Sequence, residues 1–285
     1  MKITKEIINR HNARLVSFYT SRGLTTNEAI FYANEKSSKL TDTHSELSYF
    51  KLFDRIKLHL LKSDCDSILD VGCGSGEMVI IGSLVGLEIF GCDIYVEELE
   101  LAKELAIDLD LNPNIFSIGI PAERRFDLIT MFSVLEHVPY NNLNHLLNDC
   151  LRISNSGLLT IHPGRFKFVD DHTRIPFLGL FKRRNVLKLL KLLNVKYVLS
   201  ENKEWDVYLR SWKELNLELR DFKLNFINDK INYPPVSQVS QLKFQFSIRP
   251  GIIFRNFYFI FIYLFFTIDK EDKFPYHNIL ITNND

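Results

Sequence analysis

A glycine-rich turn between two apolar stretches constrains the fold of this chain more than any other feature. The apolar residues Ile68, Leu69 and Val71 surround the start of the turn at 70–77, D-V-G-C-G-S-G-E, and the apolar run 78–81 follows it. This order predicts a strand, a tight loop and a helix. Glycines suit such a loop because they adopt positive φ and let a ligand approach the backbone, while the helix directs its free N–H groups at that ligand. The stretch is typical of the start of a nucleotide-binding βαβ unit.

An acidic residue, Asp93, ends the second predicted strand at 87–93. A carboxylate about 20 residues after the glycines is placed to accept hydrogen bonds from ribose hydroxyls. Dinucleotide-binding proteins have a third glycine where this chain has Glu77, so we expect no binding of NAD. Asp70 precedes the first glycine, where a dinucleotide-binding strand is usually apolar. Its carboxylate is suited to a cation such as the ammonium of a methionine moiety.

Together with F-D-L-I-T-M-F-S-V-L-E-H-V at 126–138, these features resemble the class I S-adenosylmethionine-dependent methyltransferases, over roughly residues 67–160. The resemblance implies an α/β fold with a doubly wound, seven-stranded, mostly parallel sheet, and S-adenosylmethionine as the cofactor. An unrelated α/β domain with a similar turn is the alternative. The resemblance also implies a cofactor site made of Asp70, Gly72, Cys73, Gly74, Gly76, Asp93, Ile94 and Phe132.

Composition narrows the class of substrate. Of the 285 residues 46% are hydrophobic, which supports a large core, and 35 basic residues balance 35 acidic ones. Because no net charge favours nucleic acid, we expect a small or glycan-type acceptor and no nucleic-acid partner. The four cysteines form no C-x-x-C pair, and the first residues lack the apolar stretch of a signal peptide. Both observations favour reduced thiols and a cytoplasmic protein.

Polar residues after two predicted strands are the candidates for catalysis. His137 follows the fourth strand, where it is able to remove a proton from the acceptor near neutral pH. Alternatively, Glu136 and His137 only satisfy backbone groups at the start of a helix. His172 lies in the loop after the fifth strand, and this loop contacts a polar substrate, binds a metal or is purely structural. We expect no metal, because Asp170 and Asp171 would point to opposite sides of an extended segment.

Four regions are expected along the chain. Residues 1–63 form three helices, which the resemblance implies cover the cofactor site as a lid, whereas a packing extension that contacts no ligand is the alternative. Residues 64–200 form the α/β core that binds S-adenosylmethionine, and a sixth strand is predicted at 195–199. Residues 201–275 form an insertion with an apolar helix, and residues 276–285 supply the final strand of the core sheet.

The apolar helix expected at 251–268 is rich in Phe, Ile and Tyr. Its uninterrupted part, 257–266, is shorter than the roughly 20 residues of a membrane-spanning helix. A buried helix is therefore expected, and peripheral contact with a membrane is the alternative.

These observations predict an S-adenosylmethionine-dependent methyltransferase that methylates an oxygen of a small or glycan- or lipid-linked acceptor. Two alternatives stay open. One is a quinone- or lipid-type C- or O-methyltransferase, and the other is a catalytically silent subunit that only binds the cofactor.

Overall fold

The computed structural model describes residues 3–43, 48–61, 67–167, 170, 172–173, 175–193, 206–227, 231, 271 and 276–284. Its α-helices are α1 (Lys5–Ser21), α2 (Thr26–Ser38), α3 (Tyr49–His59), α4 (Glu77–Leu84), α5 (Val96–Asp108), α6 (Tyr140–Arg152), α7 (Arg183–Leu192) and α8 (Trp212–Glu218). Its strands are β1 (Ser67–Val71), β2 (Glu88–Asp93), β3 (Phe116–Ile118), β4 (Leu128–Phe132), β5 (Leu158–Pro163), β6 (Phe222–Phe226) and β7 (Tyr276–Asn283). Short 3₁₀ turns cover Pro113–Ile115, Leu135–His137 and Leu178–Leu180.

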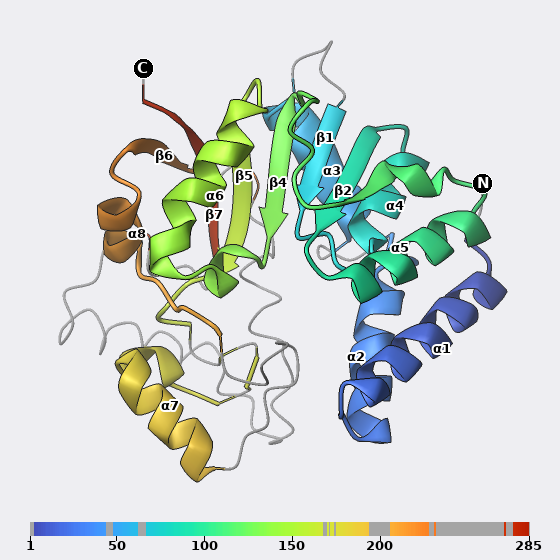
Figure 1. The fold of residues 1–285 in the computed structure, drawn as a ribbon, viewed down its shortest axis with the longest axis horizontal. Coiled ribbons are helices and arrows are strands. Elements are labelled where there is room, and N and C mark those ends of the chain that lie inside the picture. The colour runs from blue at the N-terminus through green and yellow to red at the C-terminus, as the bar shows by residue number, and fades with distance from the viewer. Residues whose placement is uncertain are drawn as a thin grey trace. The chain divides into compact units, whose positions relative to one another are not determined.

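The strands form a seven-stranded sheet in the order β3-β2-β1-β4-β5-β7-β6 (Figure 1). β1 pairs in parallel with β2 and β4, β2 pairs in parallel with β3, and β7 pairs antiparallel with β6. Ile68 and Leu69 in β1 are fully buried, as expected for a parallel strand covered on both faces. The predicted doubly wound, mostly parallel α/β sheet is confirmed, and its order reverses next to β1, where such sheets bind ligands.

The chain divides into two compact units. The first comprises residues 1–134 and 145–159, and the second comprises residues 135–144 and 160–285. Each is described separately below.

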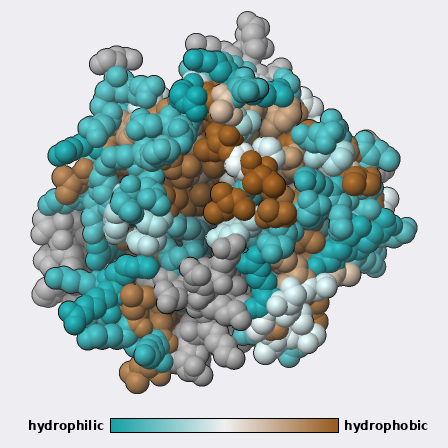
Figure 2. Space-filling view, viewed as in Figure 1, coloured by the Kyte–Doolittle hydropathy of each residue, from teal (hydrophilic) through white to brown (hydrophobic). Residues whose placement is uncertain are grey.

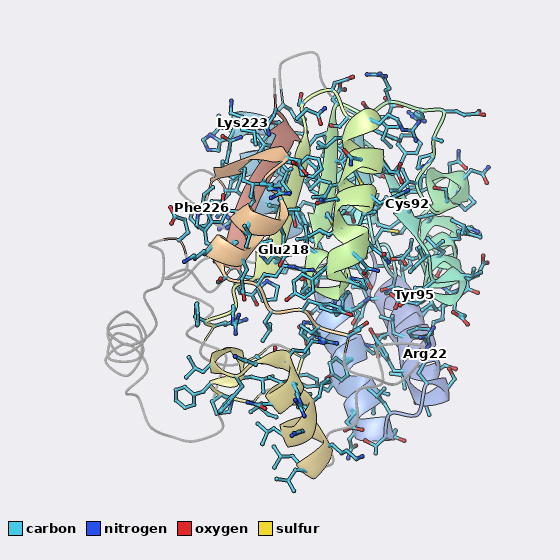
Figure 3. The ribbon with its side chains drawn as sticks, turned by 60° about the vertical axis from the view of Figure 1, so that its left-hand side comes forward. Arg22, Cys92, Tyr95, Glu218, Lys223 and Phe226 are labelled. Atoms are coloured by element: carbon cyan, nitrogen blue, oxygen red, sulfur yellow. The ribbon has the colours of Figure 1, made fainter. Side chains whose placement is uncertain are left out.

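In the first unit, the N-terminal helices α1 and α2 lie side by side (Figure 1). Thr25 caps α2 in a reciprocal arrangement with Glu28, so two otherwise free backbone N–H groups at this end are satisfied. Arg22, at the end of α1, reaches over the ring of Tyr95 and pairs with Glu97 of α5 at 3.0 Å (Figure 3). The N-terminal helices are thereby attached to the βαβ unit.

α4 is buried on all sides, which is why it shows no amphipathic pattern in the sequence. Residues 77–82 are all buried, and the ring of Phe53 from α3 lies against Gly82. A helix without a polar face belongs in the interior of a protein. The helix that begins at the glycine-rich loop is therefore held firmly by its surroundings.

In the second unit, β6 is a strand that the sequence did not indicate. It lies within the predicted insertion 201–275 and pairs with β7 over Phe222–Phe226. The strand predicted at 195–199 and the apolar helix predicted at 251–268 lie outside the described residues. Among the described residues, no helix is long and apolar enough to cross a membrane.

Candidate functional site

The glycine-rich loop joins the end of β1 to the start of α4. Gly72, Gly74 and Gly76 have φ values of 75°, 53° and 84°. A Cβ on Gly76 would lie 2.7 Å from the Cβ of Ala102 and 2.9 Å from the ring of Phe116. Backbone conformation and lack of space therefore both exclude a side chain at Gly76.

The carboxylate of Asp93 holds this loop in place. Its Oδ2 accepts a hydrogen bond of 2.8 Å from the N–H of Gly74, and its Oδ1 accepts one of 3.0 Å from the N–H of Tyr95. Each carboxylate oxygen has a further lone pair, so Asp93 is able to accept ribose hydroxyls while it holds the loop. The side chain expected to bind ribose thus also shapes the glycine-rich loop.

Asp70 is a buried carboxyl group at the end of β1. It is 4% exposed, and one of its oxygens accepts a hydrogen bond of 2.8 Å from the hydroxyl of Thr130 on β4. Burial raises the pKa of Asp70 to about 7, and the negative charge of Asp93 adds to this effect. A nearby cation favours the charged form of such a group, so an ammonium is a fitting partner for Asp70.

Lys36 of α2 brings a positive charge to the other side of the loop. Its Nζ donates a hydrogen bond of 2.9 Å to the Ser75 hydroxyl and lies 3.5 Å from a carboxylate oxygen of Glu98. A Cβ on Gly74 would lie only 3.2 Å from this Nζ. Burial alone would lower the pKa of Lys36, but the negative charges of Glu98 and other neighbours raise it well above its usual value. Lys36 is therefore a cation, which is suited to the carboxylate of an amino-acid ligand.

A buried hydrogen-bonded pair lies next to Lys36. The Nε2 of His11, on α1, is 3.0 Å from the carboxylate of Glu77, the first residue of α4, and His11 is fully buried. The hydroxyl of Ser75 also donates to Glu77 at 2.8 Å. Burial would raise the pKa of Glu77, but Lys36 and His11 outweigh it and lower this pKa to about 2. Glu77, which occupies the position of the third glycine in a dinucleotide-binding loop, is thus an ionised carboxylate that contacts the N-terminal helix α1.

The other residues assigned to the cofactor site lie at strand ends of the same unit. Ile94, after β2, is 72% exposed, and Phe132, the last residue of β4, is partly buried. Cys73 is buried, which raises the pKa of its thiol well above the usual value. Ile118, the last residue of β3, is 65% exposed. Exposed apolar side chains thus lie at the ends of two neighbouring strands, β2 and β3.

A second polar cluster lies in the second unit and brings together the two histidines singled out from the sequence. The rings of His137 and His172 meet edge to face with their centroids 5.1 Å apart. The Nδ1 of His137 is 3.1 Å from a carboxylate oxygen of Asp206. Burial would lower the pKa of His137, but the hydrogen bond to Asp206 and the charge of Glu136 outweigh it, and the pKa is raised.

The cluster has the composition of a metal site. One ligand atom from each of Glu136, His137 and His172 lies within 4.8 Å of the other two. Imidazole and carboxylate groups at such separations are able to hold a divalent ion. The carboxylate of Asp170 accepts hydrogen bonds from the N–H groups of His172 and Thr173 and so holds this loop. Asp171, the other acid considered in the sequence, lies outside the described residues, and the absence of a metal stays a prediction.

A fully buried arginine supports the turn that carries Glu136 and His137. The guanidinium of Arg210 donates to the carbonyl oxygens of Leu135 at 2.7 Å and Val138 at 2.6 Å, on either side of the two polar residues. Its Nε donates to Glu218 at 2.9 Å, which compensates the buried charge. The planar guanidinium thus fixes the backbone from which His137 projects.

Comparisons with known proteins agree with this geometry. A family model described as a methyltransferase domain matches residues 35–163. Residues 35–163 therefore form an S-adenosylmethionine-dependent methyltransferase domain. The match includes the glycine-rich loop, Asp93 and His137, as well as Lys36 on α2.

The curated relatives of this methyltransferase domain are named ubiquinone biosynthesis O-methyltransferases. The mitochondrial one from Candida albicans is 30% identical over 158 residues, which cover 51% of this chain and 46% of the relative. The one from Alkalilimnicola ehrlichii is 27% identical and covers 60% of this chain and 66% of its own length. The chain spans about half the length of the first curated relatives it matches.

Solved structures give weaker similarity. The YcgJ protein from Bacillus subtilis aligns with a TM-score of 0.43 and 15% identity, covering 82% of this chain and all of that protein. Magnesium protoporphyrin IX methyltransferase from Synechocystis aligns with a TM-score of 0.42 and 14% identity, covering 68% of this chain and 86% of its own. Assignment to the methyltransferases therefore depends on the family model and on the glycine-rich loop.

Several residues of both clusters were not identified from the sequence. Lys36 lies in a predicted helix and belongs to no recognisable motif. Asp206 and Arg210 belong to a region whose sequence showed no clear pattern. Arg210 follows Asp206 by four positions, but nothing in the sequence linked these two charged residues to His137. Only the folded chain brings these residues together.

Acidic pH should destabilise the methyltransferase domain through Glu77. Since the pKa of Glu77 is lowered from 4.5 to about 2, its contribution is present above pH 4.5 and is lost as the pH falls toward 2. This contribution is worth about 3 kcal/mol at most. Urea unfolding at several pH values should show that Glu77→Gln is less stable than wild type at pH 7, and that the difference shrinks at low pH. The exposed Glu100→Gln variant is the control, and an equal effect in both variants would refute the role of the buried pair.

Proposed function

We propose that the chain transfers the methyl group of S-adenosylmethionine to an oxygen of a small acceptor. The observation that carries the proposal is the glycine-rich loop, held by Asp93 and flanked by Asp70 and Lys36. Asp70 is charge-complementary to the ammonium of the cofactor, Lys36 to its carboxylate, and Asp93 has acceptor capacity for its ribose. When bound, the cofactor supplies a methyl group on a positively charged sulfur, which is a strong electrophile.

The apolar residues at the strand ends would bind the remaining part of the cofactor. Ile94 follows β2 and Ile118 is the last residue of β3, and both are largely exposed. Burial of such side chains against a flat adenine ring is favourable, because apolar surface is removed from water. This assignment gives a reason for apolar side chains that would otherwise remain in contact with water.

His137 is the group we propose as the proton acceptor for the substrate hydroxyl. Asp206 lies against its Nδ1 and favours the tautomer that carries a proton there, so that Nε2 is left to accept the substrate proton. The raised pKa makes His137 a stronger base than an ordinary histidine. Because methyl transfer is a direct displacement, the remaining task of the protein is to align the acceptor oxygen.

The acceptor we favour is a phenolic quinone precursor rather than a glycan. The curated relatives named above are O-methyltransferases of ubiquinone biosynthesis. A phenol such as the tyrosine side chain has a pKa near 10, so its proton is far more readily removed by an imidazole than that of a sugar hydroxyl. A base of the strength of His137 therefore suits a phenolic acceptor.

Transfer of a labelled methyl group from S-adenosylmethionine tests the proposal. The protein should label a catechol-type quinone precursor and leave nucleotide sugars and glycolipids unlabelled. Binding of S-adenosylmethionine by calorimetry, without labelling of any acceptor, would instead indicate a silent cofactor-binding subunit. Labelling of a glycan alone would overturn the choice of acceptor, and failure to bind S-adenosylmethionine would overturn the proposed function as a whole. NAD should not bind.

A further inference from the structure

The segment 175–193 differs in charge from the rest of the chain. It contains five basic residues and no acidic one, whereas basic and acidic residues are equal in number over the whole chain. The remainder of the chain consequently has a net negative charge. The basic residues all lie just before or within α7: Lys182, Arg183, Arg184, Lys188 and Lys191.

The same segment exposes large apolar side chains. Phe177 is 38% exposed, Phe181 47%, Leu187 41% and Leu192 82%. Single exposed apolar residues are common, but four within 16 residues, interleaved with basic residues, form a distinct surface. We call it the basic-apolar face and define it by Phe177, Phe181, Arg184, Leu187, Lys188 and Leu192.

The opposite side of α7 anchors the helix in the second unit. Val186 and Leu190 are buried in a cluster with Leu178 and Val207. Since these residues hold the helix, the exposed residues are not needed for its packing. In Figure 2, hydrophobic and hydrophilic residues stand side by side at the lower left, where Figure 1 places α7.

We propose that the basic-apolar face docks onto a lipid bilayer that contains anionic lipids. Basic side chains near such a surface are attracted to it by about 1 kcal/mol each, which corresponds to roughly fivefold in partitioning. The leucine and phenylalanine side chains would enter the boundary between headgroups and acyl chains, while lysine and arginine extend their charged ends to the headgroups. The combination of positive charge and exposed apolar side chains on one short helix suits this environment.

Other partners fit this surface less well. A nucleic acid would satisfy the basic residues but would leave Leu187 and Leu192 in water, because phosphates offer them no apolar contact. The apolar segment 251–268, considered as a membrane contact from the sequence, lies outside the described residues. The basic-apolar face is a separate candidate and does not depend on the proposed methyl transfer.

Vesicle co-sedimentation of the full chain tests this inference. The protein should bind vesicles that contain phosphatidylglycerol more tightly than vesicles of phosphatidylcholine alone, and high salt should weaken this binding. The double variant Arg184→Glu, Lys188→Glu should reduce binding by about tenfold or more, since each reversal replaces an attraction with a repulsion. Leu187→Ser with Leu192→Ser should reduce binding even at low salt.

A matched control uses two exposed lysines of the same unit. Lys213→Glu with Lys223→Glu changes the net charge equally and should leave vesicle binding largely intact. Circular dichroism confirms that each variant is folded. The proposal is overturned if folded wild-type protein ignores anionic vesicles, or if the control pair weakens binding as much as the α7 pair. It is also overturned if the α7 variants alter only self-association on gel filtration, or only binding to a duplex DNA probe.

Discussion

Replacement of His137 by alanine should lower single-turnover methyl transfer by about 10²-fold or more, in line with the contribution of a general base. The affinity for S-adenosylmethionine should stay unchanged, because none of the residues placed at the glycine-rich loop is altered. Asp206→Asn should have a smaller effect in the same direction, since it weakens the hydrogen bond that orients the ring without removing the base. Rapid-quench measurement with labelled cofactor and a catechol acceptor provides the rate of the chemical step.

A second histidine variant separates this effect from a general loss of imidazole. His145 on α6 is exposed, and its ion-pair partner in the described part of the chain is Asp149, so His145→Ala should retain wild-type turnover. If His137 merely satisfied backbone groups of its turn, its loss would appear as about 1 kcal/mol of stability with turnover nearly kept. Wild-type turnover in His137→Ala would move the role of base to His172, whose ring lies edge to face against that of His137.

Replacement of Asp93 by alanine should weaken S-adenosylmethionine binding by roughly tenfold or more. Loss of hydrogen bonds between a carboxylate and ribose hydroxyls costs about 1.5 to 3 kcal/mol. The hydrogen bond to Gly74 is lost as well, which removes the side chain that holds the glycine-rich loop. Isothermal calorimetry at fixed salt and pH measures the effect.

Asp108→Ala is the matched control for this experiment. Asp108 is a largely buried carboxylate of the same unit that pairs with Arg10 and Arg14 and lies outside the glycine-rich loop. The Asp108→Ala variant should be less stable than wild type and should keep the wild-type affinity for S-adenosylmethionine. Equal affinity in Asp93→Ala and wild type would contradict the assignment of the ribose-binding acid.

The sequence predicted most of the first unit correctly. Residues 67–71 are mostly apolar, as in a strand buried on both faces, and the glycines and Asp93 follow at the spacing of a nucleotide-binding unit. This local pattern was enough to predict the positions of β1, α4 and β2. The final strand at 276–285 was also predicted, and β7 lies there at Tyr276–Asn283. The seven-stranded sheet followed from these elements together with the resemblance.

The candidate site was harder to predict because its supporting residues are distant in sequence. Asp206 and Arg210 lie about 70 residues after the turn that they contact, in a region with no clear periodicity. Lys36 was indistinguishable from a solvated lysine on a polar helix face, and only its hydrogen bond to Ser75 reveals its position at the loop. Charge and hydropathy patterns along the sequence indicate local secondary structure. The contacts of Lys36, Asp206 and Arg210 join residues far apart in sequence, so they become visible only in the folded chain.

The hydrogen bond between His11 and Glu77 bears on where a stable methyltransferase domain begins in this chain. The family model starts at residue 35, within α2, and so includes Lys36 but not His11. A polypeptide cut at that boundary would leave the carboxylate of Glu77, the first residue of a helix that has no polar face, without its hydrogen-bond partner His11. We therefore expect a piece that begins at residue 35 to be less stable than one that includes α1. The start of the family model and the extent of the packing around Glu77 do not coincide in this chain.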